Sequence, residues 1–217
     1  KNSDFFDAIG GAEIIEAEET LDPYEGMPKS RKEEMKVKTP KNRAPIKLSV
    51  HGIMEEVKTS GGRGVELGNK VHVYAEKLVK GTEMMSGDVD EENEEDFVNV
   101  KKFLKGLTGT LEAEVPILFP LELDGTKKRR VILNGVIDLL EILEDGIQII
   151  DYKTDETRAG EKEYQKQLSV YYHVLKTVHP DKEVSASIYY TKKDEQVPIS
   201  PISIKKLRKI VQAKVRD

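Results

Sequence analysis

Apolar residues change their spacing near Gly109, and the change separates predicted helices from predicted strands. Over residues 64–80 and 97–107 apolar side chains recur at intervals of three and four, which predicts two helices. From Thr110 onward, runs rich in Val, Ile and Leu predict strands over 110–119, 131–143 and 147–153. The same patterns predict a helix over 161–178, a strand over 184–191 and a helix over 203–215.

Turn and cap residues fit this division. Asp124-Gly125 and Asp145-Gly146 are common hairpin dipeptides, and they separate the three central strands. Ser203 is a favourable N-cap for the last helix. The predicted order is two helices, three antiparallel strands, a helix, a strand and a helix. This order indicates an α/β (α+β) domain with a mixed central sheet flanked by helices.

The first 45 residues differ from the rest of the chain. They contain acidic clusters and prolines at 23, 28, 40 and 45, and they show no sustained apolar period. We interpret 1–45 as a linker or arm, either poorly ordered or docking elsewhere, and 46–217 as the folded domain. Because the chain starts at Lys1 and not at Met, we expect it to be a fragment of a longer polypeptide or to have lost its start.

Composition argues against several classes of protein. No run approaches the roughly 18 apolar residues that a membrane helix requires. The N-terminus also lacks the basic-then-apolar order of a secretory signal. The absence of cysteine excludes disulfides, thiolate zinc sites and cysteine-held iron–sulfur clusters. We therefore expect a cytoplasmic protein without a membrane partner.

Charge is unevenly distributed. The formal net charge of -5 argues against a protein that simply coats nucleic acid. Residues 82–99 hold eight acidic and no Lys or Arg side chains, whereas residues 192–217 hold eight basic and three acidic ones. An acidic total does not exclude DNA as a substrate, because carboxylates can hold divalent cations that supply the positive charge.

The predicted strand over 147–153 ends in residues suited to catalysis. Side chains alternate along a strand, so Asp151 and Lys153 project to the same side. If Asp145-Gly146 forms a two-residue loop, Asp138 lies opposite Lys153 and diagonal to Asp151. Both carboxylates can then converge on one divalent ion. A three-residue loop would turn Asp138 to the other face.

Such a group can hydrolyse a phosphodiester. The reaction requires a nucleophilic water, compensation of charge in the transition state and help for the leaving oxygen. Carboxylate-held Mg²⁺ or Mn²⁺ with a nearby lysine meets these needs. The alternative is that Asp138 and Asp151 are exposed residues at strand ends and that Lys153 simply pairs with one of them.

Four further residues could belong to the site. Glu114 interrupts an apolar strand and supplies either a third carboxylate or an ordinary outward-facing side chain. His72 could bind a metal as a neutral imidazole, although a lone His on an amphipathic helix is more often a surface or core residue. Gln167 and Tyr171 share a helix face that either approaches the site or a DNA strand, or packs in the ordinary way.

Five short motifs follow one another along the chain. They are G-x-x-x-H at Gly68 to His72, a glutamate strand at Glu114 to Ile117, G-x-I-D at Gly135 to Asp138, D-x-K-T at Asp151 to Thr154, and Q-x-x-x-Y at Gln167 to Tyr171. In this order they resemble the RecB-like nucleases of the PD-(D/E)XK superfamily, and the match spans about residues 64–190. These nucleases are the C-terminal domains of RecB and AddA helicase subunits and related stand-alone exonucleases.

The resemblance implies a PD-(D/E)XK restriction-endonuclease-like core and a role for each motif residue. Asp138, Asp151 and Lys153 would be catalytic. The ligands of a Mg²⁺ or Mn²⁺ ion would be His72, Glu114, Asp138, Asp151 and the carbonyl of Tyr152, and Gln167 and Tyr171 would line the DNA-side surface. Several relatives hold an iron–sulfur cluster on four cysteines. This chain has no cysteine and resembles the cluster-free RecB and AddA type.

The sequence therefore predicts a metal-dependent deoxyribonuclease, an exonuclease that acts on single strands or duplex ends in DNA repair or recombination. Its expected partners are DNA and helicase domains of the same or a partner chain. One alternative is a nuclease fold retained as an inactive DNA-binding or scaffolding module, but every motif residue is present. Another is an interaction domain whose acidic residues 88–96 bind a basic partner.

Overall fold

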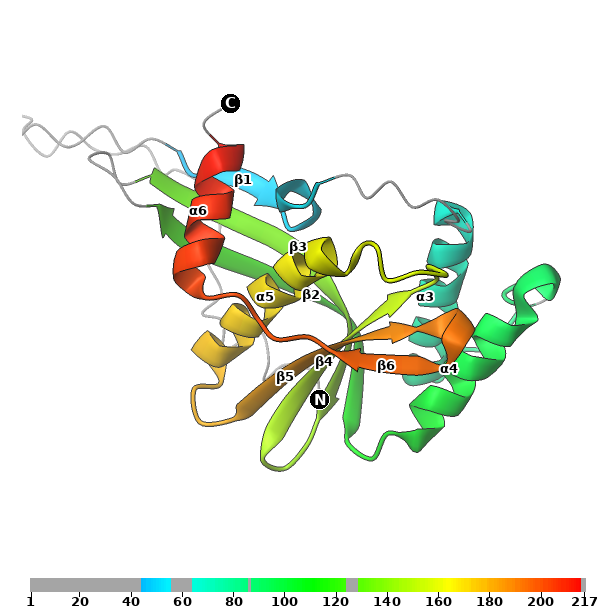
Figure 1. The fold of residues 1–217 in the computed structure, drawn as a ribbon. Coiled ribbons are helices and arrows are strands. Elements are labelled where there is room, and N and C mark those ends of the chain that lie inside the picture. The colour runs from blue at the N-terminus through cyan, green and yellow to red at the C-terminus, as the bar shows by residue number, and fades with distance from the viewer. Residues whose placement is uncertain (1–43, 56–63, 86, 124–128, 216–217) are drawn as a thin grey trace, which may run out of the picture. The chain divides into compact units, whose positions relative to one another are not determined.

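The computed structural model describes residues 44–55, 64–85, 87–123 and 129–215, which form a six-stranded mixed sheet with helices on both faces (Figure 1). The expected fold class, a mixed sheet flanked by helices, is confirmed. Except for its last two residues, the arm expected over 1–45 lies outside the described residues.

The helices lie where apolar spacing predicted them. They are α3 (Val65–Lys80), α4 (Glu94–Gly106), α5 (Glu161–Val178) and α6 (Ile204–Lys214), with short 3-10 turns η1 (His51–Ile53), η2 (Glu91–Asn93) and η3 (Thr191–Lys193). Helix α4 begins three residues earlier than predicted, since acidic residues stabilise a helix N-terminus. Ser203 caps α6 by accepting a hydrogen bond from the Lys206 N–H at 3.3 Å. Among the described residues, no helix has the length and apolar character of a membrane span.

The strands follow the order β1-β3-β4-β5-β6, and β2 pairs with the other edge of β3. They are β1 (Ile46–Ser49), β2 (Thr110–Leu123), β3 (Arg129–Ile142), β4 (Gly146–Lys153), β5 (Glu183–Tyr190) and β6 (Glu195–Pro198). The three central strands were predicted, whereas the four-residue strands β1 and β6 were not. Strand β2 accommodates Pro116 and Pro120 because it lies at an edge of the sheet within the described part of the chain.

Strand β3 changes partner along one edge, and this change positions the site. Its residues 131–134 pair in parallel with β1, and its residues 139–142 pair antiparallel with β4. The C-terminal ends of β1 and β4 therefore converge on residues 135–138. We call this stretch of β3, together with the ends of β1 and β4, the fork.

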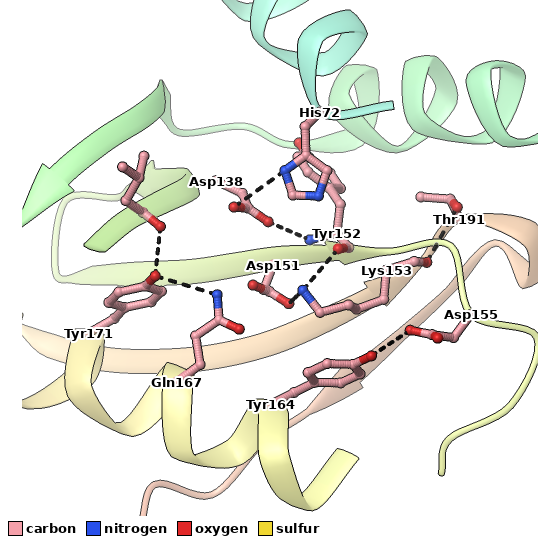
Figure 2. A network of polar contacts seen from close by, with 11 residues as sticks. His72, Asp138, Asp151, Tyr152, Lys153, Asp155, Tyr164, Gln167, Tyr171 and Thr191 are labelled. Atoms are coloured by element: carbon pink, nitrogen blue, oxygen red, sulfur yellow. Dashed lines mark hydrogen bonds and ion pairs between the residues drawn. The ribbon is translucent and has the colours of Figure 1, made fainter. Parts of the chain in front are cut away.

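The sheet separates two groups of helices. Helices α3 and α4 pack on one face, where Leu139, Ile150 and Tyr152 join their apolar side chains in a buried core. Helix α5 stands on the opposite face, and α6 packs against α5, β2 and η1 (Figure 1). Figure 2 shows the fork between these two layers, with α3 above the sheet and α5 below it.

Candidate active site

Three carboxylates lie in one row across β2, β3 and β4 at the fork. In the β2–β3 register Glu114 falls between two paired positions and faces Asp138. In the β3–β4 register the last paired residues are Leu139 and Ile150, so the next residues along, Asp138 and Asp151, face each other. We call Glu114, Asp138 and Asp151 the carboxylate row.

The hairpin between β3 and β4 differs from the predicted one by two residues in register. Leu143 N–H donates to the Gly146 carbonyl at 2.9 Å, so the two-residue loop is Glu144-Asp145 and not Asp145-Gly146. Gly146 belongs to β4, where a Cβ would lie only 3.2 Å from the carbonyl oxygen of Glu183 in β5. A side chain there would fit tightly against β5.

The two-residue shift keeps the predicted faces but changes the neighbours. Asp138 faces Asp151 directly, and it does not face Lys153 as expected. Asp138 and Asp151 are 8% and 1% exposed, so the alternative of exposed strand-end residues is wrong. A buried charge is unfavourable unless it is paired or binds a cation, and each carboxylate therefore requires a partner.

Lys153 is the cationic partner in this cluster (Figure 2). Its Nζ lies 2.5 Å from Asp151 Oδ2, and it donates a hydrogen bond to the Tyr152 carbonyl at 3.2 Å. The contact with Asp151 is an ion pair by distance without hydrogen-bond geometry. Asp151 Oδ1 and Oδ2 are both buried, and neither accepts a hydrogen bond within the described residues. Such oxygens are suited to binding a cation.

The acidic neighbours keep Lys153 protonated. Burial acts to lower the pKa of Lys153, but the negative charges of Asp151 and Asp138 act in the opposite direction and raise this pKa overall. The amine therefore stays an ammonium at neutral pH. A fixed positive charge beside a cluster of acids can stabilise an anionic transition state.

Asp138 lies between α3 and β4. Its Oδ2 accepts a hydrogen bond from the Tyr152 N–H at 3.0 Å, and its Oδ1 lies 3.5 Å from His72 Nδ1. Burial and the nearby charge of Asp151 raise the pKa of Asp138 to about 8, although Lys153 acts against this shift. Perturbed carboxyl groups of this kind gather at functional sites.

His72 and Glu114 complete a group of ligand atoms. A ring nitrogen of His72 and carboxylate oxygens of Glu114 and Asp138 all lie within 4.8 Å of one another. Burial and the positive charge of Lys153 lower the pKa of His72, so the ring is neutral and can act as a ligand. Burial and Asp138 raise the pKa of Glu114. Oxygen ligands with one imidazole suit Mg²⁺ or Mn²⁺.

Strand β2 is irregular at Glu114. This residue has a φ of 55°, a left-handed conformation that costs a non-glycine residue about 1 kcal/mol or more. Leu111 packs with the α3–α4 core, whereas Ile117 pairs with Gly135, which lies against Tyr171 of α5. Odd-numbered residues of β2 therefore change face at Glu114. The strained residue is also the one that brings a carboxylate to Asp138.

Gln167 and Tyr171 lie beneath the fork and are buried. They are 2% and 0% exposed, so the structure does not place them on an exposed DNA-side surface as expected. Their shared face turns toward the sheet, where Tyr171 Oη donates to the Val136 carbonyl at 2.7 Å and Gln167 Nε2 donates to Tyr171 Oη at 3.4 Å. A Cβ on Gly135 would lie 3.1 Å from Tyr171 and 2.9 Å from Val50, so the motif glycine admits Tyr171.

Tyr164 is a site residue that the sequence analysis missed. Its ring lies beneath Lys153, with the Nζ 4.7 Å from the ring centroid, and its Oη donates to Asp155 Oδ2 at 2.7 Å (Figure 2). The tyrosine thus holds the ammonium from below while its own hydroxyl is anchored. Its position three residues before Gln167 puts it on the same helix face, and this spacing could have revealed it.

His51 is a second residue that the sequence analysis missed. It opens η1 at the C-terminal end of β1 and is exposed to solvent. The preceding Val50 N–H donates to the Asn134 carbonyl at 2.8 Å, so η1 begins beside the fork. Partial burial and the charge of Lys153 lower the pKa of His51. No local pattern signals this residue, because its approach depends on the pairing of β1 with β3.

Comparison with known proteins agrees with this geometry. Residues 48–216 match the family model of the PD-(D/E)XK nuclease superfamily. A crystal structure of a protein designated SSO0001 is similar with a TM-score of 0.44 and 14% identity, over 85% of this chain and 83% of that one. No curated protein matches. The family match covers most of the chain, including every residue of the fork, and the chain therefore belongs to the PD-(D/E)XK nuclease superfamily.

Proposed function

We propose that this chain is a metal-dependent deoxyribonuclease of the RecB-like branch of its superfamily. The observation that carries the proposal is the buried carboxylate of Asp151, which lies beside Asp138 and whose oxygens have no partner among the described residues other than the ammonium of Lys153. A structural aspartate at this depth would be expected to have further hydrogen-bond donors. The lone-pair sites that remain suit a divalent cation instead.

The residues present fit a divalent ion. The proposed ligands are His72, Glu114, Asp138, Asp151 and the carbonyl oxygen of Tyr152, a set dominated by oxygen. When bound there, Mg²⁺ or Mn²⁺ supplies Lewis acidity toward a phosphate oxygen and lowers the pKa of a water ligand. The three carboxylates and the neutral imidazole would hold the ion at the fork, next to the ammonium of Lys153.

The side chains of the site would then have different roles in hydrolysis. A water oxygen forms a bond to phosphorus and loses a proton while the bond to the leaving oxygen breaks, and the leaving oxygen takes up a proton. Lys153, which pairs with Asp151, would hydrogen-bond either the attacking water or a phosphate oxygen on which negative charge grows. Tyr164 and its partner Asp155 keep the ammonium in position.

We further propose that this domain is the exonuclease part of a larger helicase–nuclease that acts in DNA repair or recombination. The RecB-like order of the five motifs supports this context. The net charge of -5 also supports it, because a domain with this charge should capture DNA weakly on its own. Tethering to a motor replaces intrinsic affinity with a high effective concentration.

The isolated chain should accordingly cut DNA slowly, with activity that falls steeply as salt rises and screens its few phosphate contacts. Initial rates and filter binding across a salt series would test this. Tight binding of DNA by the isolated chain at physiological salt would overturn the tethered context and leave the nuclease assignment untouched.

A time course with end-labelled DNA tests the nuclease assignment itself. Single- and double-stranded substrates are incubated with Mg²⁺ or Mn²⁺, and the controls are EDTA, the Lys153→Ala variant and RNA of the same sequence. Cleavage of DNA that requires both the ion and Lys153 supports the proposal. Binding without cleavage by the wild-type chain contradicts it and supports an inactive module. The order in which labelled products appear separates exonuclease from endonuclease action.

A further inference from the structure

Helix α6 carries the strongest concentration of positive charge on a single described element. Its eleven residues include five basic and no acidic side chains. Leu207 and Val211 are fully buried and anchor the helix, so the exposed side is basic. Lys205, Lys206 and Lys209 are exposed, and no carboxylate among the described residues forms an ion pair with them. We call these three lysines the basic ridge.

The basic ridge is connected to the fork through η1. Helix α6 packs on η1, and Lys214 Nζ near its C-terminal end donates to the Met54 carbonyl at 3.4 Å. The residue just before η1, Val50, donates its backbone N–H to the Asn134 carbonyl at 2.8 Å and lies against Gly135 of the fork. Figure 1 shows α6, in red, beside the blue β1 and η1 on the α5 side of the sheet. The ridge thus lies on a surface that continues to the carboxylate row.

The segment that leads into α4 has the opposite charge. Glu91, Glu92 and Glu94 are exposed where η2 leads into α4. The neighbouring Asp88 and Asp90 already pair with lysines of α3, at 2.7 Å and 3.0 Å. The exposed glutamates would repel a polyanion that approached from this side. The acidic and basic segments seen in the sequence therefore lie on different sides of the carboxylate row.

We propose that the basic ridge of α6 binds the phosphate backbone of the nucleic-acid strand whose scissile bond lies at the carboxylate row. The strand then approaches over α6 and η1, and not over η2 and the start of α4. This inference rests on the proposed nuclease function. It identifies the surface that binds the part of the substrate distant from the phosphate that reacts.

An elongated nucleic acid fits this surface better than other polyanions do. Helix α6 is about 16 Å long, enough to run beside several successive phosphates of one strand. Lysine binds phosphate as a point charge and reads no base, so this contact is independent of sequence. A strand can occupy the ridge and the fork at once, because η1 joins them.

The experiment compares two charge-reversed lysine pairs with the same helical spacing. The α6 variant is Lys205→Glu/Lys209→Glu. The control is Lys101→Glu/Lys105→Glu on α4, where both lysines are exposed and also four residues apart. Because the two variants change net charge equally, a difference between them reports position. Steady-state cleavage is measured on single-stranded oligonucleotides of increasing length across a salt series, and circular dichroism checks the fold.

The α6 variant should raise KM at low salt by about tenfold or more, and the loss should grow with oligonucleotide length. The slope of log KM against log salt should fall by about 1.4, since each lost phosphate contact on a single strand removes about 0.7. The α4 control should retain the wild-type KM and slope. If the double glutamate variant fails to fold, Lys205→Gln/Lys209→Gln should show the same pattern with smaller changes in KM and in the salt slope.

The assignment of α6 would be overturned if KM rose equally in the two variants, rose in neither, or rose more in the α4 control. Loss of binding to anionic lipid vesicles by the α6 variant, with DNA cleavage unchanged, would overturn it in favour of a membrane surface. If the wild-type chain cuts nothing, the proposed function fails. The ridge is then tested separately by fluorescence anisotropy with labelled DNA. Weaker DNA binding by the α6 variant alone supports the ridge, and equal DNA binding by the two variants overturns it.

Discussion

Two buried acidic residues stand three positions apart in β3, and the protein holds them in different ways. Glu141 is 5% exposed, and its Oε1 accepts hydrogen bonds from the backbone N–H groups of Thr108 at 2.9 Å and Gly109 at 3.0 Å. Asp138 is 8% exposed and accepts one backbone N–H, that of Tyr152, at 3.0 Å. It otherwise faces carboxylates and an imidazole across the fork.

The difference separates a structural acid from one suited to binding a cation. Backbone donors satisfy Glu141 without another charge, and they fix the start of β2 to the end of β3. Asp138 shares one nearby ammonium, that of Lys153, with Asp151, so burial and the like charge of Asp151 raise the pKa of Asp138. A buried acid that is short of donors destabilises the fold unless a cation is present.

The largest expected effect is on catalysis. Asp151→Ala or Lys153→Ala should each reduce cleavage by about three orders of magnitude or more, roughly 4 kcal/mol of transition-state stabilisation, because each removes a proposed ligand or a charge stabiliser. The check is kcat/KM on end-labelled DNA, with circular dichroism to show that the variants fold. A folded variant with wild-type activity would remove that residue from the site.

Glu141 should show the reverse pattern. Glu141→Ala should lower the free energy of unfolding by about 2–3 kcal/mol, because two backbone N–H groups lose their charged acceptor. Glu141→Gln should cost less, since the amide oxygen can accept the same hydrogen bonds. Urea denaturation measures both changes, and cleavage by the folded enzyme should change by less than about twofold. If Glu141→Ala is as stable as the wild-type chain but loses as much cleavage activity as Asp151→Ala does, Glu141 is not a structural acid and the contrast with Asp138 is wrong.

Local sequence was sufficient where a structure depends on neighbouring residues. The four helices and three central strands were predicted because each has several turns or alternations of apolar residues. Asp151 and Lys153 were correctly placed on one side by alternation along β4. Their approach to Asp138 required only one more strand and a loop with an even number of residues. The roles of these residues remain predictions until the variants are measured.

Features that depend on distant pairing were not predicted. Strand β1 and the position of His51 require parallel pairing with a part of β3 far along the chain, and four residues carry too little pattern to indicate it. The shared face of Gln167 and Tyr171 was predicted, but its burial depends on how α5 packs against the sheet. Gly146 is the first residue of β4, where it pairs with Glu183 of β5, and the turn dipeptide alone does not reveal this.

The pH dependence of stability tests Asp138 directly. Its pKa in the folded protein lies above the unfolded value of about 4, so the native state keeps a proton that the unfolded chain releases. In EDTA this group should therefore reduce stability as pH rises from about 4 toward about 8, by at most about 1.4 kcal/mol per pH unit, and have no further effect above that range.

Asp138→Asn removes this titration. In urea denaturation across the same pH range, the variant should lose less stability than the wild-type chain does. Added Mn²⁺ should stabilise the wild-type chain more than the variant, because the amide lacks the negative charge. If the variant keeps the full pH dependence of its free energy of unfolding, another group causes that dependence, and Asp138 is not the carboxyl whose pKa is raised by folding.

The smallest expected effect distinguishes the two imidazoles at the fork. His72 contributes a ring nitrogen to the group of ligand atoms with Glu114 and Asp138, whereas His51 is not part of that group. Imidazole favours Mn²⁺ over the harder Mg²⁺, so His72→Ala should lower activity and reduce the ratio of Mn²⁺- to Mg²⁺-supported cleavage by about fivefold, roughly 1 kcal/mol. His51→Ala should leave that ratio at its wild-type value. If the ratio is unchanged in His72→Ala as well, His72 is a packing residue against the Tyr152 ring, whose centroid lies 5.9 Å away, and the ion is held by oxygen alone.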